Sequence, residues 1–327
     1  MNCILSMDIG GTNTSVGIFD GKLNQLHFFS AKTKEKSPYG FAKEIAGVVK
    51  QKSMRIVAAG IAVAGPVQNG SVRLPNAGIS LSVGKFKDIL EVKNTIMLND
   101  FEAVAYALNA LKKNDAIPLT KNKPKEKSVK VVLGAGTGLG KAVLYFDKKL
   151  GFHVPLSAEE GHTAIAIATP EEFALLEFIK KREYADVVWE DVLSGRGIAS
   201  IYEFVQQKKR IKNSVAREIE SSRDKASIIS KYRKTDASCK ETFKIFSRIY
   251  ARFIRNSMLQ SLPYGGVYVA GGVAIKNMDI FQSKEFKAEL YKSAVFVDII
   301  KKIPLFVFKS TAIGLKGAAF AAKKLAK

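Results

Sequence analysis

The sequence predicts an α/β fold of two related domains with a ligand cleft between them. The chain has 327 residues, more than a single hydrophobic core usually spans. Patterns typical of strands and of helices follow each other along it. A strand, a glycine-rich turn and a second strand occur at the start and again near residue 137, which indicates an internal duplication.

The first copy opens the chain and leads into further strands and a helix. Apolar patterns and turn signals predict two strands around a tight polar turn, a third strand after the hairpin signal Asp20-Gly21, a helix capped by Ser37, and a buried strand. In chain order these segments are Asn2–Asp8, Ile9–Asn13, Thr14–Asp20, Leu26–Ser30, Pro38–Gln51 and Arg55–Ala62.

The second copy has the same plan as the first. Val129–Leu133 and Lys141–Asp147 are predicted strands on either side of Gly134–Gly140, and Phe146-Asp147 ends the second strand as Phe19-Asp20 ends its counterpart. Two copies of a hairpin with a phosphate-sized turn imply two related domains whose turns could face one nucleotide.

The remaining patterns set the domain boundaries. Helical patterns dominate from Trp189 to about Leu262, a short strand follows at Gly266–Ala270, and a last helix is expected over Thr311–Ala326. The segment Lys112–Lys130, rich in Lys, Asn and Pro, is expected to cross between domains. We therefore expect a small domain, residues 1–111 completed by 311–327, and a large domain, residues 112–310, whose helical insert at 207–240 has no assigned role.

The composition indicates a globular protein of a reducing compartment. Hydrophobic residues make up 47% and charged residues 25% of the chain, within the ordinary globular range. Its two cysteines, Cys3 and Cys239, form neither a disulfide framework nor a zinc-binding spacing. The sequence contains no secretory h-region and no run of about 18 apolar residues. We expect a cytoplasmic protein that is neither secreted nor membrane-spanning.

The net charge of +22 could indicate a nucleic-acid or anionic-membrane partner. The basic residues, however, are spread along the chain. The densest basic region, Gln207–Lys234, is interrupted by Glu218, Glu220 and Asp224, as on a solvated helical face. We therefore expect no specific nucleic-acid partner and no membrane partner.

The two glycine turns have the composition of phosphate-binding turns. Asp8-Ile9-Gly10-Gly11-Thr12-Asn13 combines a carboxylate at a strand end with two glycines, a hydroxyl and an amide. Backbone N–H groups in such a turn can bind an anion, and the carboxylate can hold Mg²⁺ through water. One Gly-Gly hairpin is structurally ordinary. The second turn, Gly134–Gly140, has four glycines around Thr137, more than a hairpin needs, which favours phosphate binding at Gly136, Thr137 and Gly138.

A third motif, Asn99-Asp100, stands between an apolar strand pattern and a helical pattern. Either residue could simply cap the helix. With two phosphate turns in the same chain, a carboxylate at the carboxyl end of a strand is also well placed as a general base for a hydroxyl nucleophile.

Six motifs together resemble the bacterial-type glucokinases, a family of the sugar kinase, actin and heat-shock chaperone superfamily. They occur in the family's order and cover nearly the whole chain: Asp8–Asn13, Asn99-Asp100, Gly134–Gly140, Ala158–His162, Val192–Gly195 and Val269–Gly272. The resemblance implies a two-domain actin-like ATPase fold, also described as a duplicated ribonuclease H-like fold. It also implies ATP and Mg²⁺ as cofactor and metal, and a homodimer as one possible assembly.

The resemblance also implies a role for individual residues. Asp100 looks like the base that receives the sugar's proton, and further positions look like sugar ligands: Asn76, Asn99, Glu159, His162 and Glu190. Carboxylates and amides can each hold one or two hydroxyls. Gly271-Gly272 resembles the adenosine motif. Without the family pattern, Glu159 and His162 would be a polar loop, Glu190 an exposed position and Gly271-Gly272 a plain turn.

The sequence departs from the family pattern at several positions. Glu160 stands where the family usually has glycine, Arg196 where it often has proline, and Arg255 where a glycine is usual. Gly78–Ser82 lacks the usual aromatic residue. These changes leave the phosphate turns intact but weaken a claim of strict glucose specificity.

The function expected from these residues is ATP-dependent phosphorylation of a hexose, with glucose converted to glucose 6-phosphate. The alternatives are a kinase for mannose, fructose or an amino sugar, and a non-catalytic nucleotide-binding regulator whose basic surface engages nucleic acid. A non-catalytic relative has no need of Asp100, Glu159, His162 and Glu190 together, which favours the enzyme.

Overall fold

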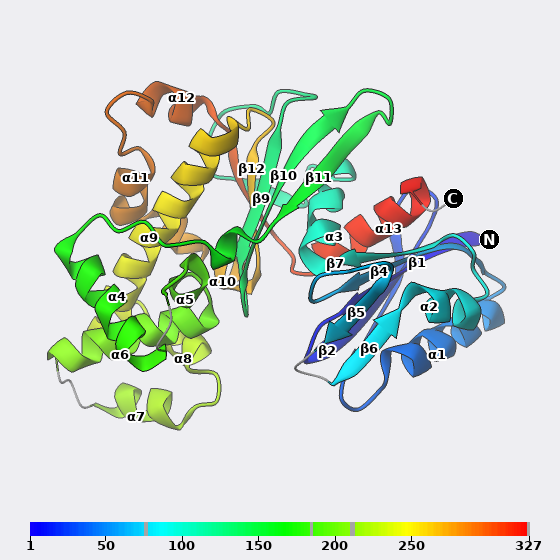
Figure 1. Cartoon of the computed structure of the whole chain (residues 1–327), viewed down its shortest axis with the longest axis horizontal. Coiled ribbons are helices and arrows are strands. Elements are labelled where there is room, and N and C mark those ends of the chain that lie inside the picture. Colours follow the sequence, from blue (N-terminus) through cyan, green and yellow to red (C-terminus); the bar gives the residue numbers. More distant parts are fainter. Residues whose placement is uncertain (75–77, 184–185, 210–212, 326–327) are drawn as a thin grey trace. The chain divides into compact units, whose positions relative to one another are not determined.

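The structure is a computed structural model that describes residues 1–74, 78–183, 186–209 and 213–325 (Figure 1). The chain divides into two compact units. Unit 1 comprises Met1–Asp115, Leu144–Ser157 and Ser310–Lys327, and unit 2 comprises Ala116–Val143 and Ala158–Lys309. The domain boundaries drawn from the sequence, after residues 111 and 310, remain a prediction.

Unit 1 contains a five-stranded sheet, a two-stranded sheet and four α-helices among its described residues. In chain order its elements are β1 Asn2–Ile9, β2 Asn13–Phe19, β3 Gln25–Lys32, α1 Pro38–Gln51, β4 Arg55–Val63, β5 Ser71–Leu74, β6 Ile79–Ser82, α2 Val83–Leu90, β7 Thr95–Asn99, α3 Asp100–Tyr106, the 3₁₀ turn η2 Ala107–Asn109 and, at the end of the chain, α13 Ile313–Leu325.

The larger sheet of unit 1 has the strand order β3-β2-β1-β4-β7. β1 pairs antiparallel with β2 and parallel with β4, and β4 pairs parallel with β7. Since parallel strands end at the same edge, the carboxyl ends of β1, β4 and β7 lie together. This edge carries the first glycine turn and the Asn99-Asp100 motif.

Alternating residues of β1 build two hydrophobic cores on opposite faces of this sheet. Leu5 and Met7 belong to a core formed with α1 and α2, whereas Ile4 belongs to a core formed with α3 and α13. α13 packs so closely on the sheet that a Cβ at Gly60 of β4 would lie 2.1 Å from the carbonyl oxygen of Ala318. The last helix thus completes the unit that the first strand begins.

Unit 2 contains most of a six-stranded sheet and a helical region. In chain order the elements are β8 Ala116–Pro118, β9 Lys130–Ala135, β10 Leu139–Asp147, β11 Phe152–Ala158, η3 Glu160–His162, α4 Pro170–Glu183, α5 Trp189–Val192, α6 Gly195–Lys209, α7 Ser214–Ser221, α8 Lys225–Tyr232, α9 Ala237–Ser261, β12 Val267–Ala270, α10 Gly272–Lys276, η4 Met278–Gln282, α11 Lys284–Leu290, α12 Val297–Lys302 and β13 Leu305–Phe308. Residues 144–147 of β10 and all of β11 except Ala158 lie in the segment that counts with unit 1.

The sheet of unit 2 has the strand order β11-β10-β9-β12-β13-β8, with β9, β12 and β13 parallel. Its core is dominated by α9, a 25-residue helix with fully buried side chains such as Phe246, Tyr250 and Phe253. Asp236 caps this helix by accepting hydrogen bonds from the N–H groups of Ser238 and Cys239, both at 2.9 Å.

Each unit contains the duplicated plan predicted from the sequence. β1 lies between the strand that follows its turn and a parallel strand, β4; β9 lies between the strand that follows its turn and a parallel strand, β12. The expected helices at Pro38–Gln51 and from Trp189 onward are present, as is the short strand before Gly271.

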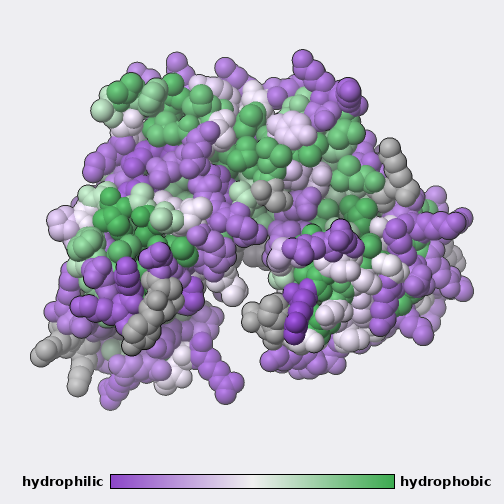
Figure 2. Space-filling model, in the orientation of Figure 1, coloured by the Kyte–Doolittle hydropathy of each residue, from purple (hydrophilic) through white to green (hydrophobic). Residues whose placement is uncertain are grey.

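The basic region after Gln207 is a set of helices with ion pairs on its surface. Lys231 pairs with Glu218 at 3.0 Å, and Arg233 pairs with Asp279 at 2.6 Å. Hydrophilic side chains cover most of the face that Figure 2 shows. Over the residues that the structure describes, no helix is both long enough and apolar enough to cross a bilayer.

Candidate active site

The first glycine turn connects β1 to β2 in unit 1. The N–H of Gly10 donates to the carbonyl of Asn13 at 2.9 Å, which closes the turn. Thr12 and Asn13 are exposed, and Gly10 and Gly11 are half-buried. The turn therefore presents backbone and polar side chains to solvent, as an anion-binding turn requires.

Thr33 holds this turn in place through hydrogen bonds. Its role was not predicted from the sequence. Its hydroxyl donates to the carbonyl of Gly10 at 2.8 Å and contacts the Thr14 hydroxyl at 3.0 Å, and its N–H donates to the carbonyl of Thr12 at 2.9 Å. Thr33 follows β3 and has no local motif. Only the pairing of β2 with β3, which sets Asn13 opposite Lys32, brings it to the turn.

Asp8 and Asp100 lie at the same edge of the unit 1 sheet. Asp8 is paired with Ala62 of β4, and Leu98, two residues before Asp100, is paired with the same Ala62 from the other side. Both aspartates are half-buried. The pKa of Asp8 is raised to about 6, chiefly because burial disfavours its charge and secondarily because the charge of Asp100 repels it.

Asn99 is the N-cap of α3, as the simpler interpretation of the motif predicts. Its Oδ1 accepts hydrogen bonds from the N–H groups of Phe101 at 2.8 Å and Glu102 at 3.2 Å, and its Nδ2 donates to the carbonyl of Gly65 at 3.1 Å. Asp100 is the first residue of the helix, and its Oδ1 also accepts from the N–H of Phe101 at 2.8 Å. The cap thus fixes where the Asp100 carboxylate leaves the backbone.

The second glycine turn, in unit 2, is packed directly against the Gly271-Gly272 motif. Gly134 of β9 pairs with Ala270 of β12, and a Cβ at Gly134 would lie 2.5 Å from the carbonyl oxygen of Ala270. Gly271 has a φ of +90°, and a Cβ there would lie 2.2 Å from the carbonyl oxygen of Ala135. Only glycines allow this close approach, which sets the predicted phosphate turn and the predicted adenosine motif side by side.

Glu190, a predicted sugar ligand, is hydrogen-bonded to the second glycine turn. Its Oε2 accepts a hydrogen bond from the N–H of Leu139 at 2.9 Å, and a Cβ at Gly138 would lie 2.6 Å from the same oxygen. The backbone of Gly136 is held in turn, because its N–H donates to Gly138 at 2.8 Å and its carbonyl accepts from Gly195 at 2.9 Å.

Glu159 and His162 lie in the same neighbourhood of unit 2. They flank and end the 3₁₀ turn η3, and both are exposed. The segment that follows them pairs with the segment before Glu190: the N–H of Trp189 donates to the carbonyl of Thr163 at 3.1 Å. Unit 2 therefore brings Glu159, His162 and Glu190 together with the second glycine turn, whereas Asp8, Asn99 and Asp100 belong to unit 1.

All three charged departures from the family pattern have partners of opposite charge. Glu160 pairs with Lys141 at 2.6 Å and Arg196 with Asp191 at 2.5 Å. Arg255 pairs with Glu289 at 3.0 Å. Glu160 and Arg255 are largely buried in unit 2, whereas the Arg196 side chain is 54% exposed.

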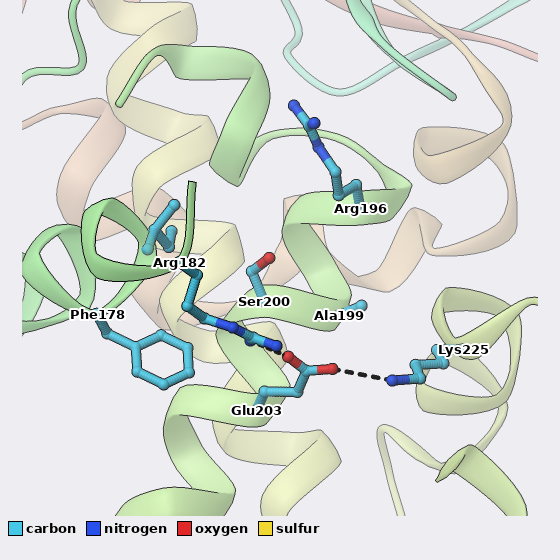
Figure 3. A pocket seen from close by; sticks show the side chains of 8 residues that line it. Phe178, Arg182, Arg196, Ala199, Ser200, Glu203 and Lys225 are labelled. Carbon is cyan, nitrogen blue, oxygen red and sulfur yellow. Dashed lines mark hydrogen bonds and ion pairs between the residues drawn. The ribbon is translucent and has the colours of Figure 1, made fainter. Parts of the chain in front are cut away.

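A cavity of about 340 Å³ lies between α4, α6 and α8 of unit 2 (Figure 3). Arg182 and Lys225 both point toward Glu203, and the Lys225 ammonium lies 2.9 Å from its carboxylate. These cations are thus paired with the carboxylate that shares the cavity. None of the residues predicted to bind sugar or ATP lines it.

The candidate metal ligand is Asp8. Among the residues that the structure describes, no group of three or more His, Cys, Asp or Glu side chains is arranged to hold a metal ion. A Mg²⁺ ion fits Asp8 on other grounds, because the ion binds oxygen ligands, keeps several waters and takes other ligands from phosphates. A divalent cation would also relieve the repulsion between Asp8 and Asp100. Asn76, the remaining predicted sugar ligand, lies outside the described residues.

The chain is similar to glucokinases over nearly its whole length. The family model described as Glucokinase matches residues 5–325. The chain is 32% identical to a glucokinase of Agrobacterium fabrum over 97% of this chain and 90% of that one. It is 28% identical to a glucokinase of Nostoc punctiforme over 99% and 100%. A crystal structure of glucokinase from an Antarctic psychrotroph superimposes with a TM-score of 0.82 at 26% identity, covering 98% of this chain and 99% of that one.

Proposed function

Since this chain belongs to the glucokinase family, we propose that it transfers the γ-phosphoryl group of ATP to the C6 hydroxyl of glucose, with Asp100 as the general base. The enzyme is an ATP-dependent hexose kinase. The predicted two-domain actin-like ATPase fold is confirmed by the match to the glucokinase structure.

The reaction is an in-line displacement at the γ-phosphorus. The sugar oxygen forms a bond to phosphorus while the bond to the β,γ-bridging oxygen breaks, and ADP leaves with that electron pair. The hydroxyl proton passes to the carboxylate of Asp100. Such a reaction depends mainly on positioning and on stabilising negative charge.

Asp100 suits the role of base because its backbone is fixed. It follows the N-cap Asn99 and begins α3, where its Oδ1 accepts the N–H of Phe101 at 2.8 Å. A general base must stand within hydrogen-bond reach of the proton that it takes, and the fixed backbone determines where this carboxylate can stand. Asn99 uses its carbonyl oxygen on the cap and one N–H of its amide on the carbonyl of Gly65, so we propose that it contributes to sugar binding through the second N–H of the amide.

Glu159, His162 and Glu190 are the proposed ligands of the other sugar hydroxyls. Glu159 and His162 are exposed, and Glu190 uses one carboxylate oxygen on Leu139. A carboxylate has acceptor positions left for a hydroxyl after one such bond. We also keep Asn76 in the proposed set on the family pattern.

ATP is proposed to bind through the two glycine turns and the Gly271-Gly272 motif. The backbone N–H groups of Gly11 and Gly138, with the side chains of Thr12, Asn13 and Thr137, would bind phosphate oxygens. Gly10 and Gly136 would shape the two turns, because their N–H groups donate within them, and Gly271 and Gly272 leave room for adenosine. Asp8 would hold Mg²⁺ through water, and the bound ion would neutralise phosphate charge.

The observation that carries this proposal is the hydrogen bond from Leu139 to Glu190. It joins a carboxylate suited to a sugar hydroxyl to the turn suited to phosphate, and the turn itself contacts the adenosine motif through Gly134 and Ala270. The residues proposed for sugar, phosphate and nucleotide binding are thus connected to one another within unit 2.

A coupled assay of ADP release tests the function. We expect turnover that requires ATP, Mg²⁺ and glucose, with mannose, fructose and glucosamine at equal concentration giving lower kcat/KM. Turnover faster with another sugar than with glucose would transfer the substrate assignment to that sugar. Absence of turnover with every sugar, together with salt-sensitive binding of DNA or RNA, would contradict the kinase proposal.

We further propose the cytoplasm as the location and a homodimer as the assembly. Cys3 and Cys239 are both buried free thiols, which suits a reducing compartment. The dimer rests on family analogy, and sedimentation velocity of the purified chain would test it.

A further inference from the structure

We propose that Lys141 and Glu160 act as a positioning pair that holds the sugar-binding turn against the phosphate turn. This inference rests on the proposed function and adds a requirement for sugar affinity that the proposed sugar ligands do not supply by themselves. Neither residue is proposed to touch substrate.

The pair is buried and forms a small network. The Lys141 side chain is 2% exposed and the Glu160 side chain 17% exposed. The Lys141 ammonium donates to Glu160 Oε2 at 2.6 Å and to Gln260 Oε1 at 2.6 Å. Lys141 belongs to β10, Glu160 to the turn η3 and Gln260 to the end of α9, so three elements of unit 2 meet at one cation.

Each partner adjoins a functional segment. Lys141 follows Gly140, the last residue of the second glycine turn. Glu160 lies between Glu159 and His162, the proposed sugar ligands. A bond between their side chains therefore fixes the spacing of the sugar-binding turn and the phosphate turn.

The packing around Leu139 leaves little space between η3 and β10. A Cβ at Gly161 would lie 2.3 Å from the carbonyl oxygen of Leu139, so η3 lies directly on the backbone of β10. The N–H of the same Leu139 donates to Glu190. A shift of η3 along β10 would therefore change where Glu159 and His162 lie relative to Glu190.

Because both charges are buried, each residue of the pair needs the other. An ammonium held at 2% exposure is costly unless a carboxylate compensates it, and removing one partner leaves the other uncompensated. If Lys141 is lost, Glu160 is drawn toward water, and η3 moves with it. We therefore expect weaker sugar binding, while the glycine turns keep their own backbone hydrogen bonds.

The test compares Lys141→Met with the reversed pair Lys141→Glu/Glu160→Lys. We expect Lys141→Met to raise the glucose KM about tenfold, the size that a sub-ångström displacement of ligands produces, with the ATP KM changed by less than about threefold. The reversed pair should restore most of the affinity, because Gln260 can turn its amide to donate to the carboxylate that this double variant places on β10.

Arg255→Met is the matched control. Arg255 lies on α9 like Gln260, is 13% exposed and pairs with Glu289, which keeps Arg252 as a second partner. This variant should lose thermal stability and keep the glucose KM. An equal rise of the glucose KM in Arg255→Met, or an unchanged KM in Lys141→Met, would overturn the proposal.

Two further measurements keep the result interpretable. If Lys141→Met does not fold, Gln260→Met removes one of the two Lys141 hydrogen bonds and should still raise the glucose KM about threefold. An unchanged KM would overturn the proposal.

Fluorescence of Trp189, the single tryptophan and the neighbour of Glu190, reports glucose binding without turnover. A wild type that binds glucose but does not turn over ATP would refute the kinase function and leave the positioning pair testable by this binding signal.

Discussion

Replacing Asp8 by asparagine should abolish turnover and stabilise the folded protein. Asp8 is a half-buried carboxyl whose pKa is raised to about 6, first by burial and then by the charge of Asp100. At neutral pH the folded chain keeps this group ionised at a cost in free energy. Asparagine has nearly the same shape and carries no charge, so it removes that cost.

The sign and size of the effect follow from proton linkage. The unfolded carboxyl titrates near 3.8 and the folded one at about 6, so between these values the folded state binds the extra proton. The free energy of unfolding therefore falls as pH rises through this window. At about 1.36 kcal/mol per pH unit the full cost is about 3 kcal/mol, and partial exposure to water reduces the expected gain in Asp8→Asn to about 2 kcal/mol.

Urea unfolding of both proteins in EDTA, at about pH 4 and about pH 7.5, measures this gain. The advantage of Asp8→Asn should be small at the lower pH and near its full value at the higher one. The other carboxyls are common to both proteins and cancel in the difference, except Asp100, whose repulsion by Asp8 is part of the measured effect. Adding Mg²⁺ at the higher pH should stabilise the wild type more than the variant.

Two results would contradict a charge-based cost at Asp8. An Asp8→Asn protein less stable than the wild type at neutral pH would show that the carboxylate makes net favourable contacts. A difference that does not change with pH would show that charge is not its source.

Three further substitutions, the first with a matched control, test the packing around the site. Gly317→Ala places a Cβ 1.7 Å from the carbonyl oxygen of Ala103, so it should lower the free energy of unfolding by about 3 kcal/mol or more in urea. The control, Gly314→Ala on the same helix, meets only ordinary contacts and should be tolerated. Asn99→Ala removes the cap of α3 and should lower the free energy of unfolding by about 1 kcal/mol. It should also lower kcat, because the backbone at Asp100 is then less firmly held. Unchanged stability would contradict the cap. Gly271→Ala forces a side chain into a φ of +90° against Ala135 and should raise the ATP KM and lower the melting temperature; a normal ATP KM would separate this glycine from the nucleotide site.

Much of the fold could be predicted because its signals are local. The helix Pro38–Gln51 has an N-cap, a proline start and an apolar stripe within one stretch, and the structure has the same bounds. The two glycine hairpins were recognisable because turn and strands are adjacent in sequence. The short strands β5 and β6 and the strand β11 lack such signals, and their pairing depends on neighbours.

The site was predicted less completely, since its contacts join distant residues. Thr33 supports the first turn only through strand register. Glu160 is a departure from the family pattern in sequence, and its meaning depends on Lys141 and Gln260, which are 19 and 100 residues away. Asn99 illustrates the opposite case, because a cap is a local feature and the sequence offered that interpretation directly.

In the proposed reaction Asp100 receives the proton of the attacking sugar hydroxyl. Its most direct test is Asp100→Asn, with kcat from the coupled assay and glucose affinity from Trp189 fluorescence. We expect kcat to fall about a thousandfold, within the range for loss of a general base, and the glucose Kd to stay within about threefold of the wild type. A kcat that stays within about tenfold of the wild type would contradict it.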